Sequence, residues 1–150
     1  MTMKVTFNDS AVIRGELPAV WQTVTDVASW PRWDPHYREA EMEGAFEPGS
    51  VGWSRVPGSL RGSFKVTALV PQGGYSTESP MPGGTMYVTT RYEQVEPGRV
   101  RVFKQYELHG SFVPFFKLFY MRPIKRQMTG MFVGLEKEAM RRHAGQEAGR

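Results

Sequence analysis

Alternating side chains over residues 60–70 constrain the fold of this chain more than any other feature. The even positions, from Leu60 to Val70, are apolar or small, whereas the odd positions from Arg61 to Thr67 are polar. This period of two is typical of a β-strand with one buried face and one face in water. The sequence therefore predicts a sheet whose apolar face must be covered by another layer of the protein.

Similar strand-like runs lie on both sides of this one and are separated by turns rich in proline and glycine. They cover residues 3–13, 37–43, 50–56, 75–79, 85–95 and 99–109. Consecutive strands with short connections predict an antiparallel meander. In the last strand, Val100 and Val102 favour one facing and Phe103 favours the other, so its facing stays open.

Helical spacing replaces the alternation from residue 112 to about residue 143. Apolar side chains recur there at every third or fourth position, and Pro123 predicts a kink or a restart of the helix. Gly130 and Gly134 each cost about 1 kcal/mol relative to alanine inside a helix. They indicate either a close approach of the sheet or open space above that face. Residues 144–150 are small and polar and are expected to fray.

Two short helices are predicted near the N-terminus, over residues 17–24 and 28–30. Pro18 suits the first turn of the earlier helix, and Asp26 can cap the later one. Pro31 and Pro35 then predict a tight, irregular turn around residues 32–34.

Composition restricts the classes of function. A length of 150 residues suits a single domain over residues 1–150, with its core over about residues 3–143. The absence of cysteine excludes disulfides and thiolate chemistry. The first residues lack the apolar segment of a signal peptide, and no run approaches the length of a membrane span, so we expect a cytoplasmic protein.

No motif indicates a metal ion or a cofactor, and we expect neither. Aromatic and basic residues do not interleave as in RNA-binding sheets, so nucleic acid is not an expected partner. The net charge is +4, and many of the basic residues lie in the C-terminal third. A basic helix face there is either a solvated surface or a contact for phosphate or anionic lipid.

Two segments resemble the START-related SRPBCC superfamily, nearest to its polyketide cyclase/dehydrase-like branch. They are Leu17-Pro18-Ala19-Val20-Trp21 and the Trp-Pro-Arg-Trp sequence of residues 30–33. The element order over residues 3–143 also matches, although the first proline is displaced from the usual Pro-x-x-Val-Trp pattern. The resemblance implies an α+β helix-grip fold, in which a curved antiparallel sheet of six to seven strands wraps around a long C-terminal helix. It does not imply one function, because that branch includes lipid binders, cyclases and hydrolases.

The resemblance also implies a cavity between the sheet and the C-terminal helix. A single helix cannot cover a curved sheet of this size, so side chains or a ligand must fill the remaining apolar surface. The candidate ligand-binding residues are Trp53, Phe64, Val66, Met86, Val88, Thr90, Tyr92, Tyr106, Phe116, Phe119, Met128 and Phe132. For each of them, packing in the core is the alternative.

Catalysis in this cavity requires an acid or base. The candidates are Tyr92, His109 at the end of the last strand, and Asp34, which lies two residues before His36. Asp34 has a structural alternative, since aspartate often accepts backbone hydrogen bonds in turns.

Three functions remain open. The first is binding or carriage of a hydrophobic small molecule such as a lipid, polyketide or isoprenoid. The second is a cyclase or dehydratase, which requires a buried titratable group facing the cavity. The third is an interaction module that uses the aromatic segment of residues 112–120 or the basic helix to bind a protein or a membrane, as a dimer contact or a peripheral membrane contact. The aromatic segment is alternatively a lid over the cavity or a helix packed on the edge of the sheet.

Overall fold

The computed structural model describes residues 3–56 and 61–148 as a curved sheet with helices on its concave side. The strands are β1 (Lys4–Arg14), β2 (Glu39–Met42), β3 (Val51–Arg55), β4 (Gly62–Val70), β5 (Gly74–Met81), β6 (Gly84–Glu96) and β7 (Arg99–Gly110). The helices are α1 (Leu17–Thr25), the 3-10 helix η1 (Val27–Ser29), α2 (Trp30–Trp33), α3 (Val113–Phe119) and α4 (Met121–Ala148). Leu60, the first residue of the predicted central strand, lies outside the described residues.

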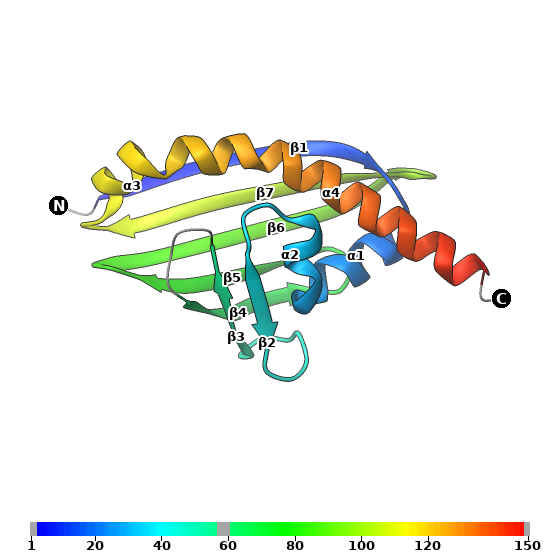
Figure 1. The fold of residues 1–150 in the computed structure, drawn as a ribbon, viewed down its shortest axis with the longest axis horizontal. Helices are drawn as coiled ribbons and strands as arrows, with labels where there is room; N and C mark the ends of the chain where they lie inside the picture. The colour runs from blue at the N-terminus through cyan, green and yellow to red at the C-terminus, as the bar shows by residue number, and fades with distance from the viewer. Residues whose placement is uncertain (1–2, 57–60, 149–150) are drawn as a thin grey trace.

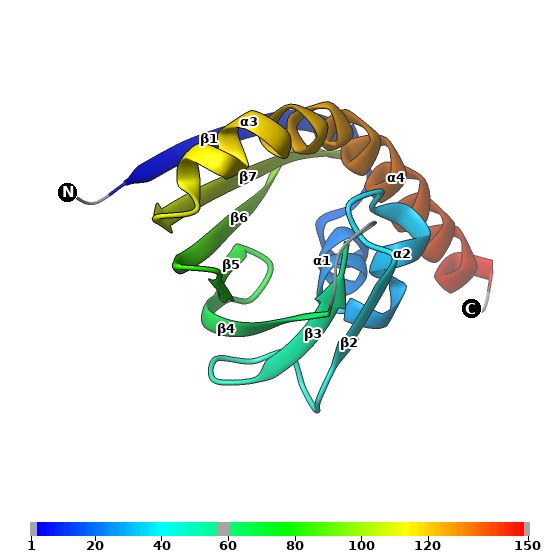
Figure 2. The ribbon, with the colours of Figure 1, turned by 60° about the vertical axis from the view of Figure 1, so that its left-hand side comes forward.

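The seven strands form one antiparallel sheet in the order β1-β7-β6-β5-β4-β3-β2. The antiparallel meander predicted for the later strands is therefore present over β2 to β7. The last strand, β7, also pairs with the first strand, β1, along the whole length of β1. Helix α4 runs along the sheet, and α1 and α2 lie between α4 and the far end of the sheet (Figures 1 and 2). This arrangement confirms the predicted helix-grip fold.

The inner face of the sheet is formed by the even-numbered residues of β6 and β7. On β6, Val88, Thr90 and Tyr92 are buried and Met86 is half-buried. On β7, the buried residues are Val100, Val102, Lys104, Tyr106 and Leu108. The facing of the last strand, which the sequence left open, is thus settled by the pairing of β7 with both neighbours.

The alternation predicted for β4 is interrupted by a bulge. Phe64 and Val66 point inward and are buried, but the register with β5 shifts between Val66 and Ala68. Beyond the shift, Ala68 is exposed and Val70 is also exposed. The prediction of one apolar face over the whole strand was wrong after Val66, because a bulge places an extra residue against its partner.

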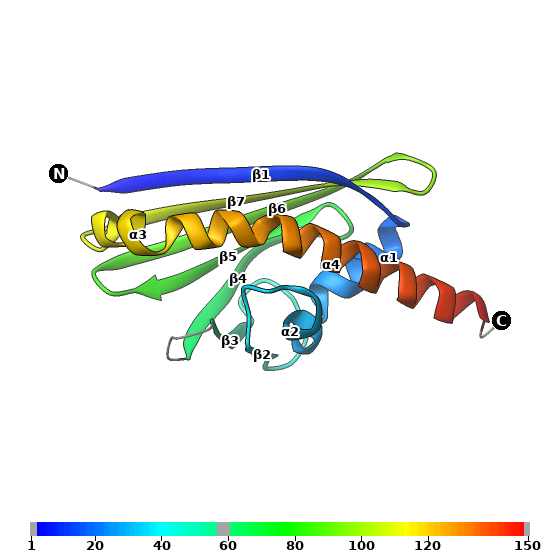
Figure 3. The same cartoon turned by 45° about the horizontal axis from the view of Figure 1, so that its top comes forward.

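Two predictions about the helices need correction, and one is confirmed. Pro31 does not start an irregular turn but lies in the first turn of α2, where the missing N–H is tolerated. The predicted restart is present, because the helical segment is interrupted at Tyr120 and Pro123 lies in the first turn of the restarted helix α4. Helix α4 also continues through Ala148, so the segment expected to fray from residue 144 is helical there (Figure 3).

The two helix glycines mark a close approach, although the neighbour is not the sheet. A Cβ atom at Gly134 would overlap the carbonyl oxygen of Trp33, and one at Gly130 would lie 3.2 Å from Cγ of Pro35. The segment that contains α2 therefore packs directly against the backbone of α4. None of the helices in the described residues is long and apolar enough to cross a membrane.

Candidate functional site

Asp34 is fixed in the interior by the turn that follows α2. Its backbone N–H donates to the carbonyl of Trp30 at 2.8 Å, and its Oδ1 accepts the backbone N–H of His36 at 2.9 Å. This hydrogen bond matches the structural alternative that the sequence analysis gave for Asp34, which was acceptance of backbone hydrogen bonds in a turn. The second carboxylate oxygen, Oδ2, remains for a contact across the interior.

Lys104 supplies that contact from the inner face of β7. Its Nζ lies 3.8 Å from Oδ2 of Asp34, and both side chains are buried. The ammonium group also lies over two aromatic rings, 5.3 Å from the centroid of Tyr106 and 6.0 Å from that of Tyr37. A charged amine is therefore held between a carboxylate and the faces of aromatic rings.

The two charges stabilise each other's ionised form. Burial alone raises the pKa of Asp34, but the charge of Lys104 and the contacts with His36 outweigh it, so that the pKa lies below its usual value. Burial likewise lowers the pKa of Lys104, and Asp34 outweighs it, so that this pKa lies above its usual value. At neutral pH the site is an ion pair, in which Lys104 is a donor and not a free amine.

His36 connects this pair to α4. Its Nε2 lies 3.0 Å from the carbonyl oxygen of Ile124, and a carbonyl can only accept, so Nε2 carries a hydrogen. Its Nδ1 lies 2.9 Å from Oδ1 of Asp34 but is not aligned for a hydrogen bond with it. The imidazole therefore joins the α2 turn to the start of α4.

Four tyrosines surround the ion pair on the remaining sides. Burial raises the pKa of Tyr92 to about 12 and also raises those of Tyr37, Tyr75 and Tyr106 above their usual value near 10. The rings of Tyr75 and Tyr92 stack with their centroids 6.4 Å apart. All four phenols are protonated at neutral pH and can act as hydrogen-bond donors.

The ion pair and three of these tyrosines, Tyr37, Tyr75 and Tyr92, border a small cavity between the sheet, α1, α2 and α4. Its volume is about 10 Å³ when measured as the space open to the centre of a water molecule, which is room for about one water. The lining residues are Val24, Trp30, Trp33, Asp34, Tyr37, Tyr75, Thr90, Tyr92, Val102, Lys104, Met131 and Leu135. Apolar walls thus enclose one charged pair and several hydroxyl groups.

Most of the predicted ligand-binding residues lie in the core, and two of them border the cavity. Thr90 and Tyr92 form part of its wall, but the hydroxyl of Thr90 is engaged with the backbone of Tyr75. Met86 is half-buried and packs on the core. The other buried members are Phe64, Val66, Val88, Tyr106, Phe116, Met128 and Phe132.

Trp53 and Phe119 lie away from the interior. On β3, Gly52 faces the ring of Phe64, so Trp53 points to the outer face, where the guanidinium of Arg61 covers its ring at 3.9 Å. Phe119 is on the exposed side of α3. The sequence pattern placed both residues on the wrong face.

His109 also lies apart from the cavity. It occupies an odd, outward position of β7, where its Nε2 lies 3.3 Å from Oε1 of Glu107 and its ring contacts exposed Tyr87. Of the three candidate catalytic residues, only Asp34 and Tyr92 reach the cavity. Within residues 3–56 and 61–148, no group of His, Cys, Asp and Glu side chains could hold a metal ion.

The main residue that sequence reasoning missed is Lys104. A signal was available, because Val100, Val102, Lys104, Tyr106 and Leu108 share one face of β7, and a lysine among them must be buried with a partner. Tyr37 and the two tryptophans of α2 were also missed as wall residues, since their positions depend on the packing of α2 against α4. Tyr75 of β5 was missed as well.

Comparison with known proteins gives a family and a fold. The family model described as polyketide cyclase / dehydrase and lipid transport matches residues 4–140. A norcoclaurine synthase point mutant from Thalictrum flavum, in complex with a transition-state analogue, has a TM-score of 0.74 at 11% identity, over 95% of this chain and 98% of that chain. The ZhuI aromatase/cyclase from Streptomyces sp. R1128 has a TM-score of 0.75 at 14% identity, over 93% and 96%. No curated protein matches the sequence significantly.

Proposed function

The chain belongs to the polyketide cyclase / dehydrase and lipid transport family, and from this premise we propose that it binds a small, mostly apolar molecule that carries a carbonyl or phenolic oxygen. The observation that carries the proposal is the enclosed Lys104–Asp34 pair among aromatic side chains. A buried ion pair contributes little to stability by itself, because a protein with apolar residues of similar volume in its place is often as stable or more stable. The pair therefore indicates a role beyond packing.

The chemistry of Lys104 selects for an oxygen acceptor. An ammonium group has three donors, and its 3.8 Å separation from Asp34 exceeds the 2.7–2.9 Å typical of a direct charge-assisted hydrogen bond. Lys104 therefore keeps donor capacity toward the cavity. Tyr37 and Tyr92 add neutral donors, and the two tryptophans of α2 supply flat apolar walls.

Binding requires the cavity to expand. The space accommodates about one water molecule, whereas ligand sites commonly span about 300–1,000 Å³. Met131 borders the space and can change shape at low cost, because its side chain is flexible. We infer that the α2 segment also separates from α4 when ligand enters, since it closes the cavity between the sheet and that helix.

Cyclase or dehydratase chemistry is the second candidate, and the same ion pair favours it. Lys104, held protonated by Asp34, can donate to a carbonyl oxygen and stabilise the negative charge that develops there on enolisation. A strong base is harder to assign, because the pKa of Asp34 is lowered and Tyr92 holds its proton to about pH 12. The donors therefore support binding and polarisation of a carbonyl more directly than proton abstraction.

A matched pair of probes tests the proposal. Isothermal titration calorimetry with 2-acetylnaphthalene and 2-ethylnaphthalene compares two ligands of similar shape, only one of which has a carbonyl. We expect the ketone to bind at least about tenfold more tightly, since a hydrogen bond to a charged group contributes about 1.5–3 kcal/mol. Lys104→Met combined with Asp34→Asn removes both charges together and should abolish the preference.

Either of two results would overturn the proposal. One is equal affinity of the wild-type protein for the two probes, which would mean that the buried donors play no part in recognition. The other is the absence of binding by both probes while the protein remains folded by circular dichroism.

A further inference from the structure

The outer side of α3 carries a group of exposed apolar side chains, of which the three aromatic ones contact one another. We call Phe115, Leu118, Phe119 and Tyr120 the α3 patch. Leu118 is 75% exposed, and Phe115 and Phe119 are each 56% exposed. Isolated apolar side chains are common on protein surfaces, but a contiguous group of this kind indicates an interaction surface.

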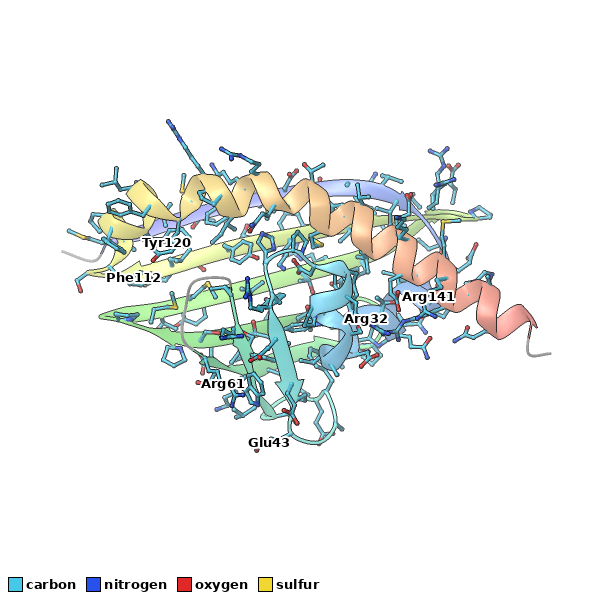
Figure 4. All side chains as sticks on the ribbon, in the orientation of Figure 1. Arg32, Glu43, Arg61, Phe112, Tyr120 and Arg141 are labelled. Carbon is cyan, nitrogen blue, oxygen red and sulfur yellow. The ribbon has the colours of Figure 1, made fainter. Side chains whose placement is uncertain are left out.

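The α3 patch is built on the core and is not a loose segment. The rings of Phe115 and Phe119 lie 4.7 Å apart, and the ring of Tyr120 lies 5.8 Å from that of Phe115. Tyr120 also stacks on Phe116, which is buried against Phe7. Figure 4 shows Phe112 and Tyr120 at the end of the molecule where α3 meets the edge of the sheet.

Positive charge accompanies the α3 patch. Lys117, Arg122, Lys125 and Arg126 are all exposed, and no Asp or Glu occurs between Glu107 and Glu136. In the part of the chain that the structure describes, none of these four cations takes part in an ion pair. Among the four, Lys125 has its Nζ over the ring of Phe7, 5.7 Å from the ring centroid.

We propose that the α3 patch and these four cations dock on the surface of an anionic lipid bilayer. Phenylalanine and leucine side chains partition into the boundary between headgroups and acyl chains, and lysine and arginine beside them bind lipid phosphates. This charge complementarity disfavours a second copy of the chain as the occupant. A two-fold dimer through the α3 patch would bring its own cations together, and residues 108–135 contain no acidic residue to offset them.

The docking surface is separate from the interior cavity, because none of the residues that border the cavity belongs to α3 or to the first turns of α4. The inference therefore does not rest on the proposed ligand-binding function. Either can fail while the other holds.

Co-sedimentation with vesicles tests the docking proposal. We expect the protein to sediment with vesicles of equal parts phosphatidylcholine and phosphatidylglycerol, but only weakly with phosphatidylcholine alone, and to be released as salt is raised. Leu118→Ser with Phe119→Ser should reduce binding about tenfold or more. Val133→Ser is the matched control, since Val133 is a similarly exposed apolar residue of α4 outside the patch.

A charge variant tests the second half of the surface. Arg122→Gln with Arg126→Gln should weaken binding to the anionic vesicles by about tenfold or more, because each basic residue near such a surface contributes roughly fivefold. Lys137→Gln, farther along α4, should leave it unchanged. All of these changes are at exposed positions, and circular dichroism checks the fold of each variant.

Three results would overturn the docking proposal. The first is no binding to anionic vesicles by the wild-type protein. The second is binding that neither the patch variant nor the charge variant weakens. The third is concentration-dependent dimerisation in analytical ultracentrifugation that Leu118→Ser abolishes, which would assign the patch to a second copy of the chain.

Discussion

The ammonium of Lys104 and the carboxylate of Asp34 face each other across the interior, 3.8 Å apart, with both side chains buried. One comes from strand β7, next to the edge strand β1, and the other from the turn after α2, so the pair ties the sheet to the helical layer. The same pair is the centre of the proposed ligand site. Its effects on stability and on recognition can be measured separately.

A double-mutant cycle on this pair is the first prediction. Asp34→Asn or Lys104→Met alone is expected to lower the free energy of unfolding by about 3–5 kcal/mol, since each leaves the other charge buried without its partner. The two changes together should cost clearly less than the sum of the single changes. Urea denaturation of the four proteins gives the coupling energy, and additive losses would contradict the account.

The second prediction concerns the decrease in the free energy of unfolding at acid pH. Glu138 accepts hydrogen bonds from Arg141 and Arg142, which lowers the pKa of its carboxyl group to about 2. A carboxyl group with a lowered pKa stabilises the fold above its unfolded pKa and loses that contribution as pH falls toward the folded value. Glu138→Gln should therefore flatten the fall in unfolding free energy between about pH 4.5 and pH 2.

Lys137→Gln on the same helix is the control for this measurement and should keep the wild-type slope. Glu138 also reaches Arg32 of α2 at 3.5 Å, and Figure 4 shows Arg32 and Arg141 on the same side of the molecule. An unchanged slope in Glu138→Gln would mean that this cluster does not stabilise the contact between α2 and α4.

A pair of glycine substitutions in α4 is the third prediction. Gly134→Ala places a Cβ against the carbonyl of Trp33, so the gain in helix propensity is lost to overpacking, and a net loss of about 1–3 kcal/mol is expected. Gly145→Ala meets no atom within 4 Å and should stabilise the helix by up to about 1 kcal/mol. Thermal unfolding of the two variants compares them directly. Equal effects would contradict the close approach at Gly134.

The titration of the buried tyrosines is the fourth prediction. Burial raises the pKa of Tyr92 to about 12 and also raises those of Tyr37, Tyr75 and Tyr106 above their usual value. A raised pKa means that the fold is stabilised below the unfolded tyrosine pKa near 10 and loses this stability as pH rises beyond it. Absorbance at 295 nm should therefore show four of the six tyrosines ionising only as the protein unfolds. Ionisation of all six in the folded state would contradict the closed interior.

Local patterns were enough to predict most of the fold. The alternation in β6 placed Met86, Val88 and Tyr92 on the inner face, and the proline-glycine turns gave the order of the strands. The bulge after Val66 could not be predicted, because it depends on how β4 pairs with β5. Gly134 signalled a close approach, but only the folded chain identifies the α2 segment as the neighbour.

The site was harder to predict because its parts are distant in sequence. Asp34 was a candidate, but its partner Lys104 lies on another element. Apolar residues occur at both even and odd positions of β7, so the sequence did not show which face of that strand is buried. Phe115, Phe116 and Phe119 follow one helical pattern, yet only Phe116 is buried. Helical spacing cannot by itself show how much of an aromatic face the sheet will cover.

Extraction of the protein from its native host, followed by mass spectrometry, tests the central claim most directly. The account predicts a stoichiometric, mostly apolar compound with a carbonyl or phenolic oxygen in the wild-type extract, and its loss from the Lys104→Met, Asp34→Asn double variant. A wild-type extract without any stoichiometric compound, or the same compound at the same level in both extracts, would contradict the claim that the buried pair recognises a ligand.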